Sequence, residues 1–258
     1  MKSLTGKTLL AIATLTYLFM WVPAIMVIVF SFSNDKLGVR WEGFTLRWYS
    51  EIFSNVAVRD AFGMSLTVAV ITVVVSTAVG TLAAYGLYKY KFRGREALRM
   101  SLLLPIIMPA VITGGALLVF FTRVLNVPLG YPSILIAHIS FGTPLAIFII
   151  LGRMARIDWS LEEASADLGA DRLTTWRKIT IPVLLPAIIA SAILIFPWSF
   201  GDFTITFFVA GAGDTTLPIY VFSALRFGET AAINAISTIF VALPVAFLLL
   251  MGFYKRKK

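Results

Sequence analysis

The sequence predicts an all-α membrane protein with six transmembrane helices and both chain ends in the cytoplasm. Of its 258 residues, 59% are hydrophobic and only 14% are charged, a balance typical of a polytopic membrane protein rather than a soluble core. Six apolar segments are close to the length of about twenty residues that a bilayer-spanning helix needs. Lysine and arginine also gather on alternate sides of those segments, as cytoplasmic loops require.

Each candidate span is a mostly apolar run bounded by polar or charged residues. In chain order the six runs are Leu9–Phe32, Ser65–Leu87, Ser101–Phe121, Ser133–Leu151, Leu184–Phe208 and Ala232–Phe253. The first is longer than the core of a signal peptide and is followed by no convincing cleavage site, so we expect it to be retained. The fifth is the least regular, because Pro197 and Gly201 interrupt it and it carries Asp202.

The distribution of cations sets the orientation of the spans. One side holds most of the 22 lysines and arginines: Lys2, Lys7, Lys89, Lys91, Arg93, Arg95, Arg99, Arg153, Arg156, Arg172, Arg177, Lys178, Lys255, Arg256, Lys257 and Lys258. The other side holds Lys36, Arg40, Arg47, Arg59, Arg123 and Arg226. We therefore expect both termini, and the polar loop before the fifth span, to be cytoplasmic.

Composition also excludes several classes of function. The net charge of +9 does not predict nucleic-acid binding, because the cations lie between apolar spans, where they orient the chain and meet anionic lipid. The chain has no cysteine and one histidine, His138, so it can hold neither a thiolate nor a multi-histidine metal centre. We expect one transmembrane domain over residues 1–258, with His138 packed within it or acting as a proton relay.

The polar loop at about 152–182 has the spacing of a helix–turn–helix element. Ser160 and Glu163 stand at the spacing of a capping box, which predicts a short helix over Leu161–Leu168. Gly169 follows where a helix end often needs a left-handed residue, and Asp171 can cap a second short helix. The segment predicts a compact knob on the membrane surface, although an ordinary solvated loop has similar composition.

The same loop resembles the "EAA" loop of the permeases of type I ABC importers, whose pattern is E-A-A-x3-G-x9-I-x2-P. The matching residues are Glu163, Ala164, Ser165, Gly169, Ile179 and Pro182, with Ser165 where the pattern most often has alanine. The resemblance implies the MetI-like permease fold in a bacterial inner membrane. In that family this loop contacts a cytoplasmic ATPase, so the resemblance makes these six residues the expected coupling site.

The resemblance further implies a machine of several subunits. A second permease, two ATPases that bind ATP and magnesium, and a periplasmic or extracellular solute-binding protein would complete it. Alternating access would then move the solute. This chain has no G-x4-G-K-[ST] phosphate-binding loop, so we expect it to be a non-catalytic subunit that binds no cofactor itself.

Asp202 is the candidate residue of the solute path. A charge near the bilayer centre costs about 2.5–3.5 kcal/mol, so its carboxylate should face a cavity or a partner. Trp198 and Phe203 could bracket an alkylammonium chain, and Ser199 lies in the same stretch. Placement of Asp202 near the outer interface, or in a pair within the assembly, explains the sequence equally well.

The first outer loop resembles that of spermidine/putrescine-type permeases, which suggests a small cationic solute. It reads W-x-G-F-T-x-x-W-Y and places Trp48 near the expected outer gate, although an aromatic segment at the membrane interface has the same composition. Members of that branch often carry further acidic residues where this chain has Gly201 and the stretch 108–110. An amino-acid-like or opine-like solute therefore stays an alternative to a polyamine.

Two other classes of protein share some of these features. An ion-coupled secondary transporter could use Asp202 and His138 as proton sites, but it would leave the EAA spacing unexplained. An intramembrane aspartyl protease needs two carboxylates that share a proton, and the predicted spans supply no second one.

Overall fold

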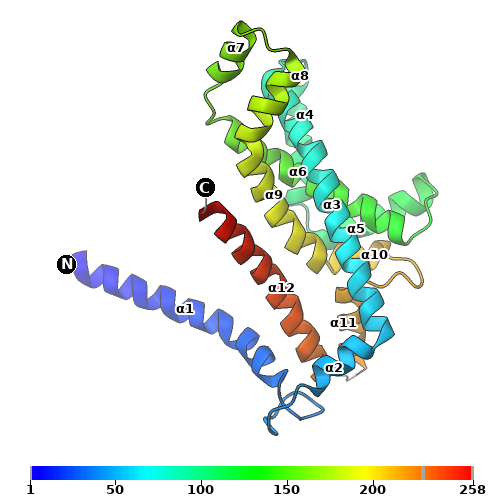
Figure 1. Cartoon of the computed structure of the whole chain (residues 1–258). Helices are drawn as coiled ribbons and strands as arrows, with labels where there is room; N and C mark the ends of the chain where they lie inside the picture. Colours follow the sequence, from blue (N-terminus) through cyan, green and yellow to red (C-terminus); the bar gives the residue numbers. More distant parts are fainter. Residues whose placement is uncertain (1, 228–229, 257–258) are drawn as a thin grey trace. The chain divides into compact units, whose positions relative to one another are not determined.

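The computed structural model describes residues 2–227 and 230–256, which are mostly helical (Figure 1). The helices are α1 Lys2–Phe30, α2 Arg47–Ser54, α3 Val56–Lys89, α4 Arg95–Ile107, α5 Ala110–Val119, the π-helical η1 Phe120–Val124, α6 Tyr131–Met154, α7 Ser160–Asp167, α8 Arg172–Thr175, the π-helical η2 Trp176–Thr180, α9 Ile181–Gly201, α10 Thr204–Val209, α11 Leu217–Arg226 and α12 Thr230–Arg256. The chain divides into a central unit, Ala61–Ile219, and a terminal unit formed by the residues before and after it.

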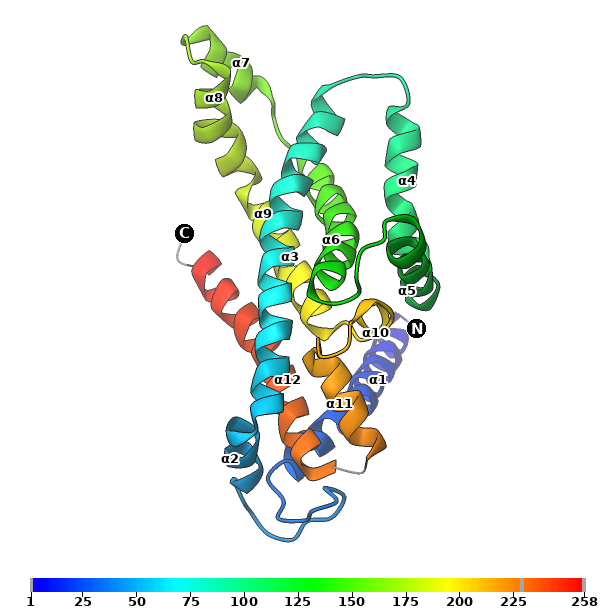
Figure 2. The ribbon, with the colours of Figure 1, turned by 90° about the vertical axis from the view of Figure 1, so that its right-hand side faces the viewer.

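Helices α3, α6 and α9 form the body of the central unit, where they run side by side (Figure 2). One buried cluster joins them at their α7 end and includes Leu87, Ile150 and Leu184. A second cluster joins α3 and α6 to η1 and α10 through side chains that include Phe121 and Ile205. The helices come closest at small residues, as is usual in membrane bundles, and a Cβ added at Gly80 would stand 2.5 Å from Cβ of Ala146.

Four of the described helical segments are long and apolar enough to cross a membrane, namely Gly6–Phe30, Val56–Lys89, Tyr131–Met154 and Arg172–Gly201. A fifth span would be made by α4 and α5–η1 together, which meet at 106°. Pro105, Pro109, Gly114 and Gly115 predict a kink within the span Ser101–Phe121, and the structure breaks this segment into two helices. Met108 precedes Pro109, so it is driven into an extended conformation (ψ 138°), and the helix restarts only at Ala110. The predicted count of six spans stays a prediction.

The predicted fifth span also ends earlier than expected. Helix α9 stops at Gly201, because Asp202 adopts an extended conformation (φ −69°, ψ 117°), and the separate helix α10 begins at Thr204. Pro197 lies inside α9 and does not end it. The change of direction thus comes at the polar residue rather than at the proline.

In the terminal unit, the aromatic outer loop folds back on itself before α2. Trp48 is buried, and its indole N–H donates to the carbonyl oxygen of Ser33 over 2.7 Å. The carboxylate of Asp35 accepts the N–H groups of Val39, Leu37 and Arg40, which lowers the pKa of that carboxyl group. The loop is therefore built on internal hydrogen bonds in addition to its aromatic surface.

Candidate functional site

Helix α7 begins after a turn that Asp158 closes. The Oδ1 atom of Asp158 accepts the backbone N–H of Ser160 over 3.0 Å, and this N–H with the Ser160 hydroxyl lowers the pKa of the Asp158 carboxyl group. The predicted capping box of Ser160 and Glu163 is wrong. Ser160 is already the first helical residue, and the residue before it, Trp159, has helical backbone angles, so the side-chain acceptor comes from Asp158.

The end of α7 is a glycine turn, as the sequence predicts. Gly169 has a φ of +82°, and its N–H donates to Ala166, while the N–H of Ala170 donates to Ser165. These two bonds form the Schellman arrangement, which reverses the chain at the end of a helix and satisfies its last carbonyls. The left-handed residue is therefore what lets α8 fold back beside α7.

Substitution of Gly169 by valine is expected to loosen this turn. Nothing lies within 4 Å of an added Cβ, so the effect would come from backbone strain, at about 1–2 kcal/mol for a left-handed L-residue. Amide hydrogen exchange in α7 should then quicken by about tenfold, since 1.4 kcal/mol is one decade. Gly169→Asn is the matched control, because asparagine tolerates this conformation. Unchanged protection in the valine variant would contradict the geometry.

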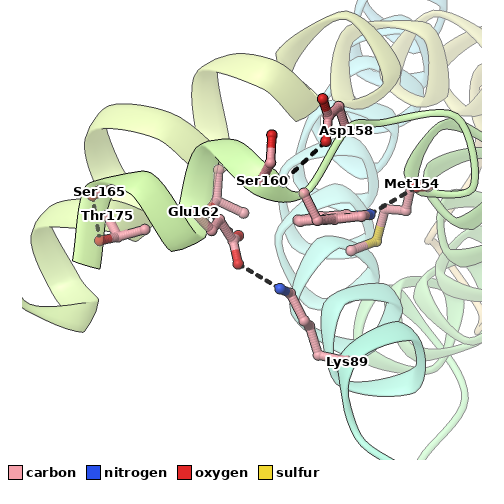
Figure 3. A network of polar contacts seen from close by, with 9 residues as sticks. Lys89, Met154, Asp158, Ser160, Glu162, Ser165 and Thr175 are labelled. Carbon is pink, nitrogen blue, oxygen red and sulfur yellow. Dashed lines mark hydrogen bonds and ion pairs between the residues drawn. The ribbon is translucent and has the colours of Figure 1, made fainter. Parts of the chain in front are cut away.

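One polar contact caps α8, and another joins α8 to α7. The Asp171 carboxylate caps α8 by accepting the N–H of Thr174 over 3.1 Å, and the hydroxyl and N–H of Thr174 lower the pKa of that carboxyl group. The hydroxyl groups of Ser165 and Thr175 lie 2.9 Å apart (Figure 3). Ser165 is buried, so the serine that departs from the alanine of the EAA pattern joins the two helices.

The motif residues divide between two faces of this knob, defined here as α7 and α8 with the Gly169 turn. Glu163, Ala164 and Gly169 are exposed, whereas Ser165 is buried. Ile179, which is half-buried, lies after the knob, in η2. Two leucines of the knob are unusually exposed, Leu168 at 89% and Leu173 at 60%. Exposed leucines beside a free-standing acidic side chain are typical of a docking surface rather than of a solvated loop.

Pro182 lies at the start of α9, directly after the π-helical turn η2. A proline at this position cannot donate the hydrogen bond that would reach the carbonyl of Lys178. The backbone instead widens by one residue, and the N–H of Ile181 donates to Trp176. The knob therefore joins α9 through an irregular turn rather than through a uniform helix.

Glu162 has contacts that sequence reasoning missed, because the EAA pattern draws attention to Glu163. Its Oε2 lies 2.6 Å from Nζ of Lys89 on α3, and its Oε1 accepts the hydroxyl of Thr180 over 2.6 Å (Figure 3 shows the pair with Lys89). The same ammonium group stands 4.5 Å from the ring centre of Trp159. The only signal in the sequence is a second carboxylate about 100° round the helix from Glu163.

A second polar cluster surrounds Asp202. Its Oδ2 accepts both the N–H and the hydroxyl of Thr206, over 2.9 and 3.0 Å, and lies 3.6 Å from Nε2 of His138. His138 is buried, and its two ring nitrogens lie 2.8 Å from the hydroxyl of Ser199 and 2.9 Å from that of Thr206. His138 is therefore buried and hydrogen-bonded through both ring nitrogens, as a packing role requires. Its role as a proton relay stays a prediction.

The structure brings only some of the predicted path residues together. Asp202, Ser199 and Trp198 all meet at His138, since the rings of Trp198 and His138 have their centres 5.4 Å apart. Trp198 also stacks on Phe141, with ring centres 4.3 Å apart. Phe203 packs against the ring of Phe207. Trp48 belongs to the terminal unit, where it is buried beneath the outer loop. The lining of a solute path by these side chains stays a prediction.

An all-helical membrane chain with an exposed helix–turn–helix knob at one end of its bundle is the architecture of an ABC-importer permease. The solved structure of a bacterial alginate ABC transporter, in complex with a periplasmic protein bound to an alginate pentasaccharide, has this fold. It aligns over 99% of this chain and 96% of its own, with a TM-score of 0.77 and 16% identity. An amino acid ABC transporter aligns over 88% and 100%, with a TM-score of 0.61 and 15% identity.

Sequence comparison gives the family. The profile described as "Binding-protein-dependent transport system inner membrane component" matches residues 76–256, and the chain belongs to this family. The putrescine transport system permease protein PotI of Escherichia coli K12 is 37% identical over 237 residues, which are 89% of this chain and 84% of that one. The spermidine/putrescine permease protein PotC of Haemophilus influenzae is 34% identical over 241 residues, 93% of each chain.

Membership confirms four predictions made from the sequence, namely the family, the permease fold, the role as a transport subunit and the location in the inner membrane. The chain is a non-catalytic subunit, and ATP hydrolysis belongs to a separate ATPase subunit. The alternatives of an ion-coupled secondary transporter and of an intramembrane protease do not agree with this family.

Proposed function

We propose that this chain is one permease of a polyamine importer, paired with a second, related permease in a heterodimer. Two cytoplasmic ATPases, which bind ATP and magnesium, and a periplasmic solute-binding protein complete the assembly. The proposal for the solute is supported by PotI and PotC, whose names specify putrescine and spermidine. A diamine or triamine is cationic at neutral pH, which agrees with a carboxylate, Asp202, in the bundle.

The knob is the proposed contact with an ATPase. The observation that carries this role is the exposed surface of Glu163 and Ala164 between Leu161 and Leu168, both of which are exposed as well. The polar side chain gives orientation and the apolar ones give contact area, as in other protein interfaces. Ser165 joins the two helices of the knob and Gly169 forms its turn, while Ile179 and Pro182 lie in the segment that connects the knob to α9.

Asp202 is proposed to bias the path toward cations, together with Ser199, Trp198, Phe203 and, on the outer side, Trp48. The carboxylate uses Oδ2 for all its contacts with Thr206 and His138. It is held in place by hydrogen-bond donors, and its charge is not cancelled by a lysine or arginine partner that the described residues supply. A fixed negative charge in a low-dielectric bundle attracts a cationic solute over a long range.

Uptake measurements on Asp202→Asn test the solute class. The assembled importer, reconstituted with its binding protein, is assayed with labelled putrescine and spermidine. Asparagine keeps an oxygen that can accept from Thr206, so assembly should persist, while uptake of the amine should fall by about tenfold for a loss of about 1.4 kcal/mol. Asp60→Asn, at an exposed carboxylate, is the matched control and should transport normally.

Each outcome of that assay has a defined meaning. Equal uptake by Asp202→Asn at equal expression would remove the carboxylate from the path. Uptake of an amino acid or an opine by the wild-type assembly, with none of a polyamine, would favour the alternative solute. In that case the knob and its ATPase partner would be unaffected, because the two proposals use different residues.

A further inference from the structure

Glu162 joins the knob to two other helices at one point. Its side chain is 12% exposed, and its two oxygens bind different partners, Lys89 at the end of α3 and Thr180 in η2. Lys89 is in turn held over the ring of Trp159, whose indole N–H donates to the carbonyl of Met154 at the end of α6. The contacts of Glu162 therefore reach α3 and the start of α9 directly, and α6 through Trp159.

The contacts of Glu162 with Lys89 and Thr180, called the joint below, are needed because α7 and α8 alone do not fix the orientation of the knob. Helix α7 has eight residues, and a helix of that length is not stable alone in water. Its outer face is exposed at Leu161 and Leu168, so the contacts that orient it must come from its inner face. On that face Glu162 supplies the ion pair, and Ser165 supplies the hydroxyl contact with Thr175.

Helix α3 is the element that this joint can move. It runs without a break over 34 residues and ends at Lys89, so it is about 50 Å long. Along α6 it is packed at Gly80 against Ala146 and at Ser76 against Gly142, where an added Cβ would find no room. A rod held this closely transmits a displacement at its end rather than absorbing it.

We propose that Glu162 is a positioning residue for coupling, which transmits the movement of α7 into α3 through Lys89 and into α9 through Thr180. This inference rests on the proposed docking of the knob on an ATPase. Glu162 and Glu163 then have different roles in coupling. Glu163 faces outward and makes the contact with the ATPase, whereas Glu162 faces inward and carries the resulting movement to the membrane helices.

The test is the number of ATP molecules hydrolysed per solute transported by the complete importer in proteoliposomes. Glu162→Gln should keep its ATPase on purification but should hydrolyse about tenfold more ATP per solute, because breaking a largely buried ion pair on one side leaves the joint loose. Lys89→Gln should have a similar effect. Lys89→Arg keeps the charge and should retain most of the coupling. Glu96→Gln is the matched control, since Glu96 is 68% exposed in its pair with Arg99.

The double variant Glu162→Gln with Lys89→Gln decides between a pair and two independent effects. If the joint acts as one unit, the double variant should be no worse coupled than the poorer single variant. A wild-type ratio in Glu162→Gln, or effects that multiply in the double variant, would overturn the inference. So would loss of the ATPase from Glu162→Gln, since that would make Glu162 a docking or folding residue. Absence of any ATPase from the wild-type complex would instead refute the proposed function.

Discussion

Replacement of Glu163 by lysine is expected to detach the ATPase from the permease while the chain stays inserted and folded. The side chain is exposed, so the substitution opens no cavity. At the proposed interface it places a cation where the resemblance to EAA-loop permeases implies basic or polar groups on the ATPase. Loss of a charged contact of this kind costs about 2 kcal/mol or more, which is about 30-fold in affinity. Transport should fall with it.

The measurement is a mild-detergent purification of the tagged chain from its native membrane, followed by mass spectrometry of what co-purifies. The wild type should bring a stoichiometric ATPase and a second permease, and Glu163→Lys should bring the second permease with much less ATPase. Glu96→Lys reverses the charge of another exposed glutamate, so it controls for the change of net charge. Normal transport by Glu163→Lys would contradict the proposed contact of Glu163 with the ATPase.

Replacement of Gly80 by valine is expected to destabilise the fold more than the Gly169→Val substitution proposed above. The added Cβ would stand 2.5 Å from Cβ of Ala146 and 3.3 Å from the backbone nitrogen of Ile147, so α3 and α6 would have to separate. Overpacking of this kind costs about 1–3 kcal/mol, or roughly 2–10 °C in the melting temperature of a chain of this size. Thermal unfolding of the purified complex in detergent measures it.

Gly86→Val provides the comparison in the same helix. Nothing lies within 4 Å of the Cβ that it would add, and both substitutions carry the same intrinsic change in helix propensity. The two variants therefore differ mainly in the contact with α6. Equal melting temperatures would mean that α3 and α6 are not packed at Gly80 as described.

Short-range patterns in the sequence were sufficient to predict most of the structure of the knob. Gly169 and Asp171 act through the backbone within three residues of themselves, so their roles are visible in the order of the residues. The start of α7 shows the limit of this method. Ser160 and Asp158 are both good capping residues two positions apart, and the path of the chain out of α6 decides which one is used.

Contacts between distant segments could not be predicted in the same way. The partner of Glu162 is Lys89, which lies on another helix and which the sequence places in a basic loop with an adequate explanation of its own. The carboxylate of Asp202 was visible as an isolated charge, but its neighbours His138 and Thr206 come together only when α6 and α10 meet. Pro105 and Pro109 predict a kink between α4 and α5, but its exact position and its angle of 106° need the structure, because prolines within transmembrane helices are common.

The π-helical turn η2 has a consequence for how this chain can change over evolution. A π turn holds one residue more than the α-helical turn it replaces, so removal of one residue from Trp176–Thr180 could restore a regular helix at little local cost. Removal of that extra residue keeps the number of helical turns, so the knob would keep its orientation about the axis of α9. A deletion within the regular helix after Pro182 would instead rotate the knob by about 100°, the angle that one residue adds to a helix. Single-residue deletions within η2 should therefore be tolerated better than deletions within α9.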